Sequence, residues 1–99
     1  MENKELKILK EFKDKYKNFI DIKYIVGSFA RGDFNKNSDI DIVYSLKKEA
    51  LSKDAFEIIN NLAKIKEELQ KKFNRKVDLI DESTLNRVAK KYMKDKIYV

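Results

Sequence analysis

Three aspartates stand where strand-like segments normally carry apolar side chains. Asp39 and Asp41 alternate with isoleucines over residues 39–45, and Asp78 interrupts the apolar run of residues 76–80. A spacing of two residues puts Asp39 and Asp41 on the same face of a strand, roughly 6–7 Å apart. Aspartate is disfavoured in strands, and two neighbouring carboxylates repel each other, so these positions point to a function.

The three carboxylates can form one site or lie on a solvated sheet edge, and their spacing alone leaves both readings open. If the apolar neighbours of Asp41 and of Asp78 face the same core, then Asp39, Asp41 and Asp78 share the opposite face. Such a trio requires cations to offset its repulsion, and Mg²⁺ is the natural choice. Three carboxylates can hold two metal ions about 4 Å apart for phosphoryl or nucleotidyl transfer.

Both glycines of the chain flank the short stretch Ser28-Phe-Ala-Arg31, whereas average usage predicts about seven glycines in this length. Gly27 and Gly32 therefore indicate positive φ or a ligand close to the backbone, although an ordinary turn is the alternative. Ser28 would add a hydroxyl and an N–H group at the start of a helix, which suits a phosphate. Arg31 is a candidate phosphate contact, or a surface arginine bonded to Asp33 or to loop carbonyls.

The residue types that are missing exclude whole classes of site. The 99 residues include no Cys and no His. The chain therefore has no disulfide, no thiolate nucleophile, no imidazole acid or base and no typical zinc site. Any proton transfer must use Asp, Glu, Lys or Tyr, and any metal must be held by oxygen.

The charge of the chain is high but mixed, with 23 Lys and Arg against 17 Asp and Glu and a net charge of +6. Lysines alternate with acidic residues as on solvated helix faces, so direct nucleic-acid binding is not expected. The densest cluster, Lys71, Lys72, Arg75 and Lys76, falls where a helix should end, a position that suits cations. No apolar run approaches the ~18 residues of a membrane span, and the N-terminus shows no signal-peptide region, so a soluble cytoplasmic protein is expected.

Apolar periodicity predicts one domain over residues 1–99, of α+β class, with a small mixed sheet of three to four strands and helices packed on it. The expected elements are a helix over 3–18, a strand over 21–27, a strand over 39–45, a long helix capped by Ser52, a strand over 76–80, a last helix over 85–93 and a short strand at 97–99. In the first strand, Ile22, Tyr24 and Val26 should share one face. The first two strands should run antiparallel, so that Gly27 and Asp39 can reach one ligand.

The stretch from Gly27-Ser28 through Ala30-Arg31-Gly32 to Ser38-Asp39-Ile-Asp41 resembles the signature of the DNA polymerase β-like nucleotidyltransferase superfamily. That signature is Gly-Ser, ten residues, then Asp-x-Asp. In so short a chain, the fuller form is most similar to the minimal nucleotidyltransferases, or MntA-like antitoxins. The resemblance covers nearly the whole chain, and it implies the polymerase β-like fold.

The resemblance also implies roles for individual residues. Gly27 and Ser28 would contact the triphosphate of ATP, beside the candidate Arg31. Asp39 and Asp41 would bind two Mg²⁺ ions. Asp78, which fits the third carboxylate, would bind the catalytic ion and help to deprotonate the acceptor hydroxyl.

The expected function is that of a Mg²⁺-dependent nucleotidyltransferase, the antitoxin of a HEPN toxin pair, which transfers AMP from ATP to a tyrosine of the HEPN RNase toxin. The residues leave two alternatives. The chain could neutralise its partner by contact without catalysis, which charge-rich helices and a thin core would allow. It could instead be a nucleotidyltransferase that acts on RNA or a small molecule, for which the basic cluster at 71–76 is the local support.

Overall fold

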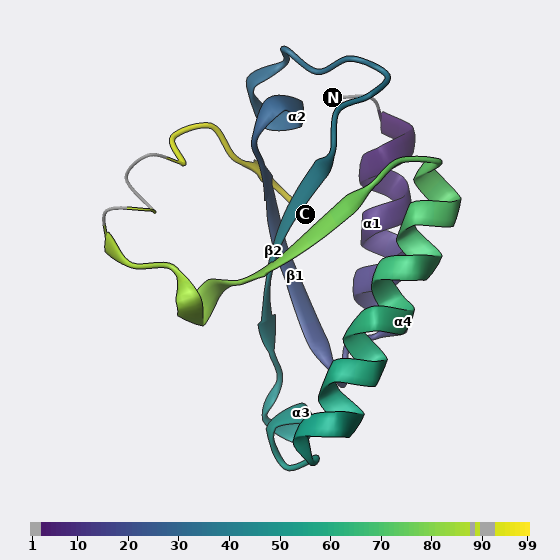
Figure 1. Ribbon diagram of the computed structural model, residues 1–99, viewed down its shortest axis with the longest axis vertical. Helices are drawn as coiled ribbons and strands as arrows, with labels where there is room; N and C mark the ends of the chain where they lie inside the picture. Colours follow the sequence, from purple (N-terminus) through teal and green to yellow (C-terminus); the bar gives the residue numbers. More distant parts are fainter. Residues whose placement is uncertain (1–2, 88, 90–92) are drawn as a thin grey trace.

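Nine helices and strands make up the part of the chain that the computed structural model describes, which is residues 3–87, 89 and 93–99 (Figure 1). In chain order they are α1 (Asn3–Lys15), β1 (Ile20–Val26), α2 (Ser28–Arg31), β2 (Ile40–Leu46), α3 (Lys48–Leu51), α4 (Ala55–Phe73), β3 (Val77–Asp81), the 3₁₀ turn η1 (Glu82–Thr84) and β4 (Ile97–Tyr98). The order of the main elements follows the hydrophobic periodicity of the sequence.

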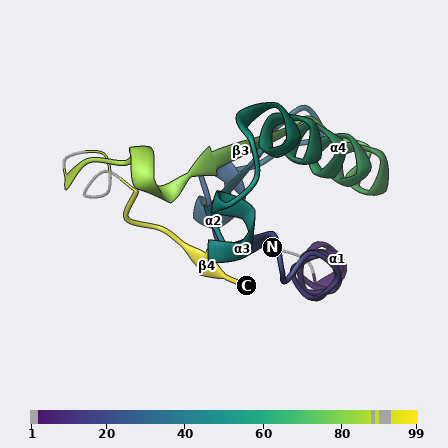
Figure 2. The same cartoon turned by 90° about the horizontal axis from the view of Figure 1, so that it is seen from below.

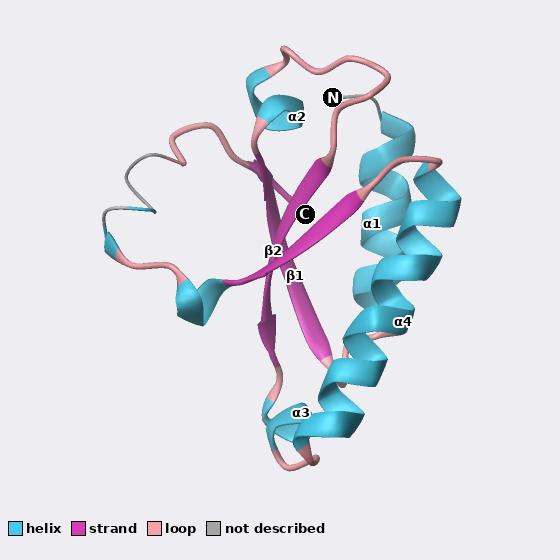
Figure 3. Cartoon of the chain, viewed as in Figure 1, coloured by secondary structure: helices cyan, strands magenta, loops and turns pink. Residues whose placement is uncertain are grey.

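The four strands form one mixed sheet in the order β3-β2-β1-β4. β1 pairs antiparallel with β2 and with β4, whereas β2 and β3 run parallel. The predictions of a small mixed sheet with helices packed on it, and of antiparallel first strands, are confirmed. A consequence is that the end of β1 and the beginnings of β2 and β3 meet at one end of the sheet (Figure 3).

The helices α1 and α4 lie side by side on one face of the sheet, as the view from below shows (Figure 2). The main core fills the space beneath them. It contains Leu9 and Phe12 from α1, Ile65 and Leu69 from α4, and Ile20, Ile22, Ile25, Ile40, Ile42 and Val77 from the strands. Among the described residues, the opposite face carries a small cluster of Tyr24, Val26 and Val43, against which Ile80, Leu85 and Met93 pack.

A β-bulge in β1 contradicts the prediction that Ile22, Tyr24 and Val26 share one face. The register with β2 shifts between Ile22 and Tyr24, so Lys23 is the extra residue. Beyond a bulge the alternation of side chains inverts. Ile22 therefore faces the helices, while Tyr24 and Val26 face the other side of the sheet.

The boundaries of the helices differ from the expected ones by a few residues. α1 ends at Lys15, and turns replace the last part of the predicted helix. Ser52 does not cap α4, because its hydroxyl donates to the Glu49 carbonyl at 2.7 Å. Asp54 is the cap, since its carboxylate accepts from the Glu57 N–H at 2.8 Å, as N-terminal acidic residues commonly do.

The C-terminal part of the chain is described in pieces. In the last predicted helix, over 85–93, residues 88 and 90–92 lie outside the described residues; of the others, Arg87 and Ala89 are helical, whereas residues 85, 86 and 93 are not. The short strand at the end is confirmed, because Tyr98 and Ile97 pair with Tyr24 and Ile25. None of the helices in the described ranges is both long and apolar enough to cross a membrane.

Candidate active site

The backbone at the end of β1 has a conformation that only glycine adopts easily. Gly27 has φ 77° and ψ −153°, a region that is costly for any residue with a Cβ. Its neighbour Val26 pairs with Asp41 across the sheet. A Cβ at position 27 would overlap the Oδ2 atom of Asp41. The backbone conformation therefore requires glycine, and a larger residue would also displace the Asp41 carboxylate.

The second glycine closes the short helix that follows. The Gly27 carbonyl accepts from the Arg31 N–H at 3.1 Å, and the Gly32 N–H donates to the Ser28 carbonyl at 2.9 Å. Gly32 is left-handed, with φ 84°, but nothing lies within 4 Å of a Cβ built there. The predicted positive φ is confirmed for both glycines, but only Gly27 faces a functional side chain.

Two of the three aspartates lie side by side on adjacent strands. Asp41 of β2 pairs in register with Asp78 of β3. The pKa of Asp41 is raised above its ordinary value, first because the carboxyl is partly withdrawn from water and then because the carboxylates of Asp78 and Asp39 are near. Arg31 acts in the opposite direction and lowers this pKa. The site therefore concentrates negative charge around one half-buried carboxyl group.

Asp39 lies just before β2, so it is not itself a residue of the strand that carries Asp41. The first ladder bond of β2 is made by the next residue, as the Ile40 N–H donates to the Lys76 carbonyl at 2.9 Å. Across residues 3–87, 89 and 93–99, no three acidic side chains are close enough to form a metal-binding group. Asp41 and Asp78 are paired in register and Asp39 is near enough to raise the pKa of Asp41, but the three do not form a closed ligand set in the described residues.

A cavity of about 290 Å³ opens beside Asp41. Its lining comprises Val26, Gly27, Arg31, Asp41, Ile80, Met93, Lys94 and Asp95. The predicted residues Ser28, Asp39 and Asp78 are not in this lining. Sequence reasoning did not find Lys94 and Asp95, because no motif or periodicity marks them and only the fold brings them to the end of β1.

Arg31 has features of both roles predicted for it, a phosphate contact and a surface arginine bonded to Asp33. Its Nε atom lies 3.2 Å from the Asp33 carboxylate, and more than half of its side chain is exposed, as for a surface arginine. The same side chain lines the cavity and lowers the pKa of Asp41. Arg31 therefore brings positive charge to the mouth of the site.

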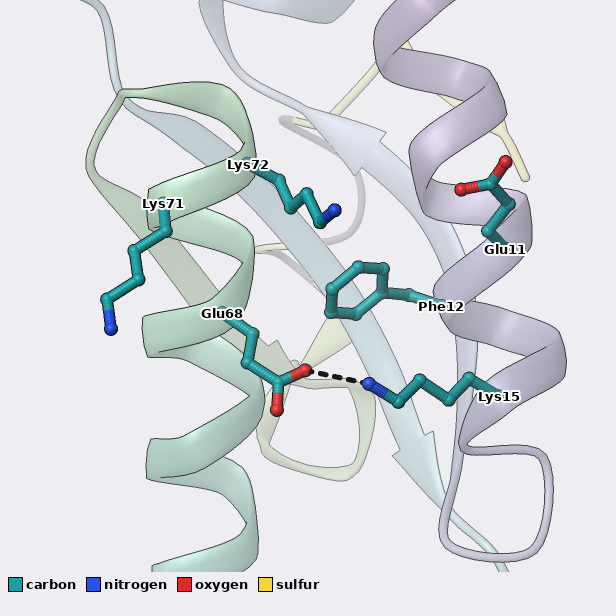
Figure 4. A pocket seen from close by; sticks show the side chains of 6 residues that line it. All are labelled: Glu11, Phe12, Lys15, Glu68, Lys71 and Lys72. Carbon is teal, nitrogen blue, oxygen red and sulfur yellow. Dashed lines mark hydrogen bonds and ion pairs between the residues drawn. The ribbon is translucent and has the colours of Figure 1, made fainter.

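A larger hollow, of about 620 Å³, lies on the other face of the sheet between α1 and α4 (Figure 4). Lys15 and Glu68 face each other across it at 3.2 Å, and the Tyr16 hydroxyl also donates to Glu68 at 2.9 Å. These groups satisfy one another and connect the two helices. We therefore place the chemistry in the smaller cavity, whose lining includes Gly27 and the half-buried carboxyl group of Asp41.

The donor chemistry of Asp39, Asp41 and Asp78 suits a divalent cation of the Mg²⁺ type, although in the described residues their side chains do not form a ready-made metal-binding group. The donors are carboxylate oxygens, the ligands that this ion prefers. Burial and the neighbouring carboxylates raise the pKa of Asp41, and a bound cation would favour its charged form. Asp39, Asp41 and Asp78 would hold the ion, and it would polarise phosphate oxygens when bound.

The sequence of residues 6–99 matches the nucleotidyltransferase domain family. The chain belongs to this family. The match includes Gly27, Asp41 and Asp78, and it confirms the predictions of the family and of a transferase. No curated protein sequence matches this nucleotidyltransferase.

Solved structures show the same fold as this nucleotidyltransferase. A toxin–antitoxin with AMP-PNP is 24% identical, with a TM-score of 0.65, over 95% of this chain and 70% of that chain. A protein described as a minimal nucleotidyltransferase is 19% identical, with a TM-score of 0.65, over 95% of both chains. A mutant of the toxin–antitoxin MntA-HpeT is 21% identical, with a TM-score of 0.66, over 99% of this chain and 72% of that chain.

Proposed function

We propose that this nucleotidyltransferase is an antitoxin that transfers AMP from ATP to a tyrosine hydroxyl of a partner HEPN RNase toxin. The observation that supports it best is the close approach of the Gly27 backbone to Asp41, with Asp78 as the next carboxylate in register. A phosphate chain that lies along a bare glycine backbone would have its reacting phosphorus beside these carboxylates. Glycine and aspartates thus serve one reaction centre.

The chain's own groups divide the work as follows. Gly27 and Ser28 would bind the triphosphate through the backbone and a hydroxyl, while Arg31 and Lys94 supply positive charge from two sides of the cavity. The acceptor oxygen forms a bond to the α-phosphorus, the bond to the β-phosphate oxygen breaks, and pyrophosphate leaves. Asp78 would take the proton of the acceptor hydroxyl, since the chain has no histidine for this role.

The relatives support the nucleotide and the kind of partner. One of the similar structures is a toxin–antitoxin with AMP-PNP, which is an analogue of ATP. Another is the toxin–antitoxin MntA-HpeT. Those proteins share the fold of this chain, so ATP and a toxin partner are the natural first candidates for it.

A second candidate function, neutralisation by contact alone, is favoured by one observation. Large apolar side chains are exposed on α3 and the first turns of α4, with exposed fractions of 63% for Leu51, 80% for Phe56 and 61% for Ile59. Such a surface suits a protein partner whether or not a transfer takes place. It requires no carboxylates, which separates it from the main proposal.

The transfer is tested with ATP labelled at the α- or at the γ-phosphate, incubated with the chain, Mg²⁺ and a purified HEPN-domain protein. Nucleotidyl transfer puts the α-label on a tyrosine of the partner, and Asp41→Asn abolishes it. Asp14→Asn, the same change on the exposed side of α1, serves as the matched control and retains transfer. Label from the γ-phosphate only, or undiminished α-labelling by Asp41→Asn, would contradict the proposal, and neutralisation without any label would favour contact alone.

A further inference from the structure

Arg75 makes contacts that separate it from the rest of the basic cluster. It lies between α4 and β3, and its Nη1 atom donates to the Asn35 carbonyl at 2.6 Å and to the Ser38 carbonyl at 3.4 Å. Its guanidinium group lies over the Phe29 ring, 5.1 Å from the centroid. One side chain therefore contacts both α2, which begins after Gly27, and the loop over residues 32–39 that leads into Asp39.

The 32–39 loop is compact before Arg75 is considered. The Asn35 N–H donates to the Ser38 hydroxyl and the Asn37 N–H to the Asn35 side chain, each at 2.8 Å. Phe34 stacks on Phe29 with the ring centroids 4.3 Å apart and the planes 8° from parallel. The loop is thus a structured turn, in which the Asn35 carbonyl also accepts from the Ser38 N–H at 3.0 Å, and Arg75 donates to the carbonyls of both residues.

The backbone of Arg75 is itself held in place by the end of α4. Asn74 ends α4 in a left-handed conformation, with φ 52°. The Arg75 N–H then donates to the Gln70 carbonyl at 3.3 Å, and the Val77 N–H donates to the Gln70 side chain at 3.1 Å. The base of the arginine is therefore fixed to α4, so its head group can hold the loop in one position.

The contacts of this segment lead directly to the carboxylates. Lys76, next to Arg75, accepts the first ladder bond of β2 from Ile40 at 2.9 Å. From there the register continues to the pair Asp41 and Asp78. The 32–39 loop connects the phosphate-binding end of β1 to Asp39, so a shift of this loop changes the distance between Asp39 and Gly27.

We propose that Arg75 is a positioning residue that fixes the 32–39 loop against α2, so that Asp39 and Gly27 already have their working separation before a nucleotide binds. This inference rests on the proposed transfer reaction for its effect on rate. Arginine suits the role because its planar head can donate to two carbonyls and still cover an aromatic ring, which lysine cannot do. Because these contacts already occupy the Arg75 side chain, only the lysines of the basic cluster remain to bind a nucleic acid.

The test compares Arg75→Met, Arg75→Lys and the matched control Lys72→Ala, which removes one positive charge from an exposed position of the same cluster. The measurements are kcat and KM for ATP at a temperature where every variant is folded, and hydrogen exchange at the Asn37 and Ser38 amides without nucleotide. We expect Arg75→Met to lower kcat on the order of 10- to 100-fold, as misplacement of reacting groups does, with a much smaller change in KM. Its loop amides exchange faster, Arg75→Lys recovers part of both effects, and Lys72→Ala resembles the wild type.

Three results would overturn the inference, and each has a distinct meaning. Unchanged kcat and unchanged loop exchange in Arg75→Met would show that the contacts position nothing. A lower unfolding temperature with unchanged kcat per folded molecule would reduce Arg75 to a structural residue. An equal loss in Lys72→Ala would show that the cluster acts through its charge, as an RNA-binding surface would. If the wild type transfers no AMP, the proposed function fails, but the exchange measurement still decides whether Arg75 fixes the loop.

Discussion

The two faces of the sheet differ in how they use the same strand. On the helix-covered face, Ile40 and Ile42 of β2 are fully buried beneath α1 and α4. On the opposite face, Asp41 lies between them in sequence, beside Asp78 and under the bare backbone of Gly27. One face is fully apolar and stabilises the fold, while the other collects like charges that oppose folding. The comparison shows that alternate residues of one strand can supply stability and chemistry separately.

This division explains how so small a chain tolerates a repulsive site. Of the buried apolar residues in the described part of the chain, the helix-covered face holds most, whereas the other face has Tyr24, Val26 and Val43. Repulsion between the carboxylates is therefore offset by packing that lies on the other side of the same strands. A ligand with positive charge or a bound metal would relieve it at the site itself.

Replacing either of two adjacent residues of β2, one on each face of the sheet, should change the free energy of unfolding in opposite directions. The residue on the helix-covered face should give the largest effect. Without Mg²⁺, Ile42→Ala should lower the free energy of unfolding by about 2–5 kcal/mol, because it empties a fully buried position. Asp41→Asn should raise it by roughly 0.2–1 kcal/mol, because a like-charge pair across two strands is removed. Urea unfolding with a chelator measures both. A loss of stability in Asp41→Asn would contradict the division between the faces.

The two glycines sharpen the comparison, because both have positive φ but only one faces a carboxylate. Gly27→Ala should cost about 1–3 kcal/mol of folding free energy and abolish transfer, since its Cβ would overlap the Asp41 carboxylate. Gly32→Ala should cost only about 1–2 kcal/mol, the price of a left-handed residue in open space. It should retain most of the transfer rate. Equal losses of activity in both variants would show that the approach to Asp41 is unimportant.

The smallest expected effect is a difference between the two faces in how their contributions to the free energy of unfolding depend on pH. The pKa of Glu68 is lowered by its hydrogen bond from Tyr16 and by Lys15, so its contribution is present at neutral pH and is lost as the pH falls below the ordinary value and through the lowered pKa. The pKa of Asp41 is raised, so the destabilisation caused by its charge is absent in acid. It grows as the pH rises from the ordinary aspartate pKa through the raised pKa of Asp41. The cost of Glu68→Gln, a few tenths of a kcal/mol at an exposed pair, should therefore vanish in acid. The gain from Asp41→Asn should vanish there too, and urea unfolding at about pH 7 and about pH 3 measures both. A gain from Asp41→Asn that persists in acid would mean that charge is not its cause.

The sequence predicted the features that depend on spacing along one strand. Asp39, Asp41 and Asp78 were assigned to one face because side chains alternate, and Gly27 was singled out because glycine is otherwise absent from most of the chain. The features that depend on contacts between distant segments were not predictable. The bulge at Lys23 inverts Tyr24 and Val26 without any Gly or Pro to mark it. Lys94 reaches the cavity only through the fold, and Arg75 looked like a cation at a helix end.

The most direct test of the site is a calorimetric titration of ATP into the isolated chain, with and without Mg²⁺. The wild type and Asp14→Asn should bind ATP only when Mg²⁺ is present. The Asp39→Asn/Asp41→Asn double variant should show no such binding although it remains folded. Binding that is equal in the double variant, or that does not require Mg²⁺, would contradict the proposal that these carboxylates form the nucleotide site.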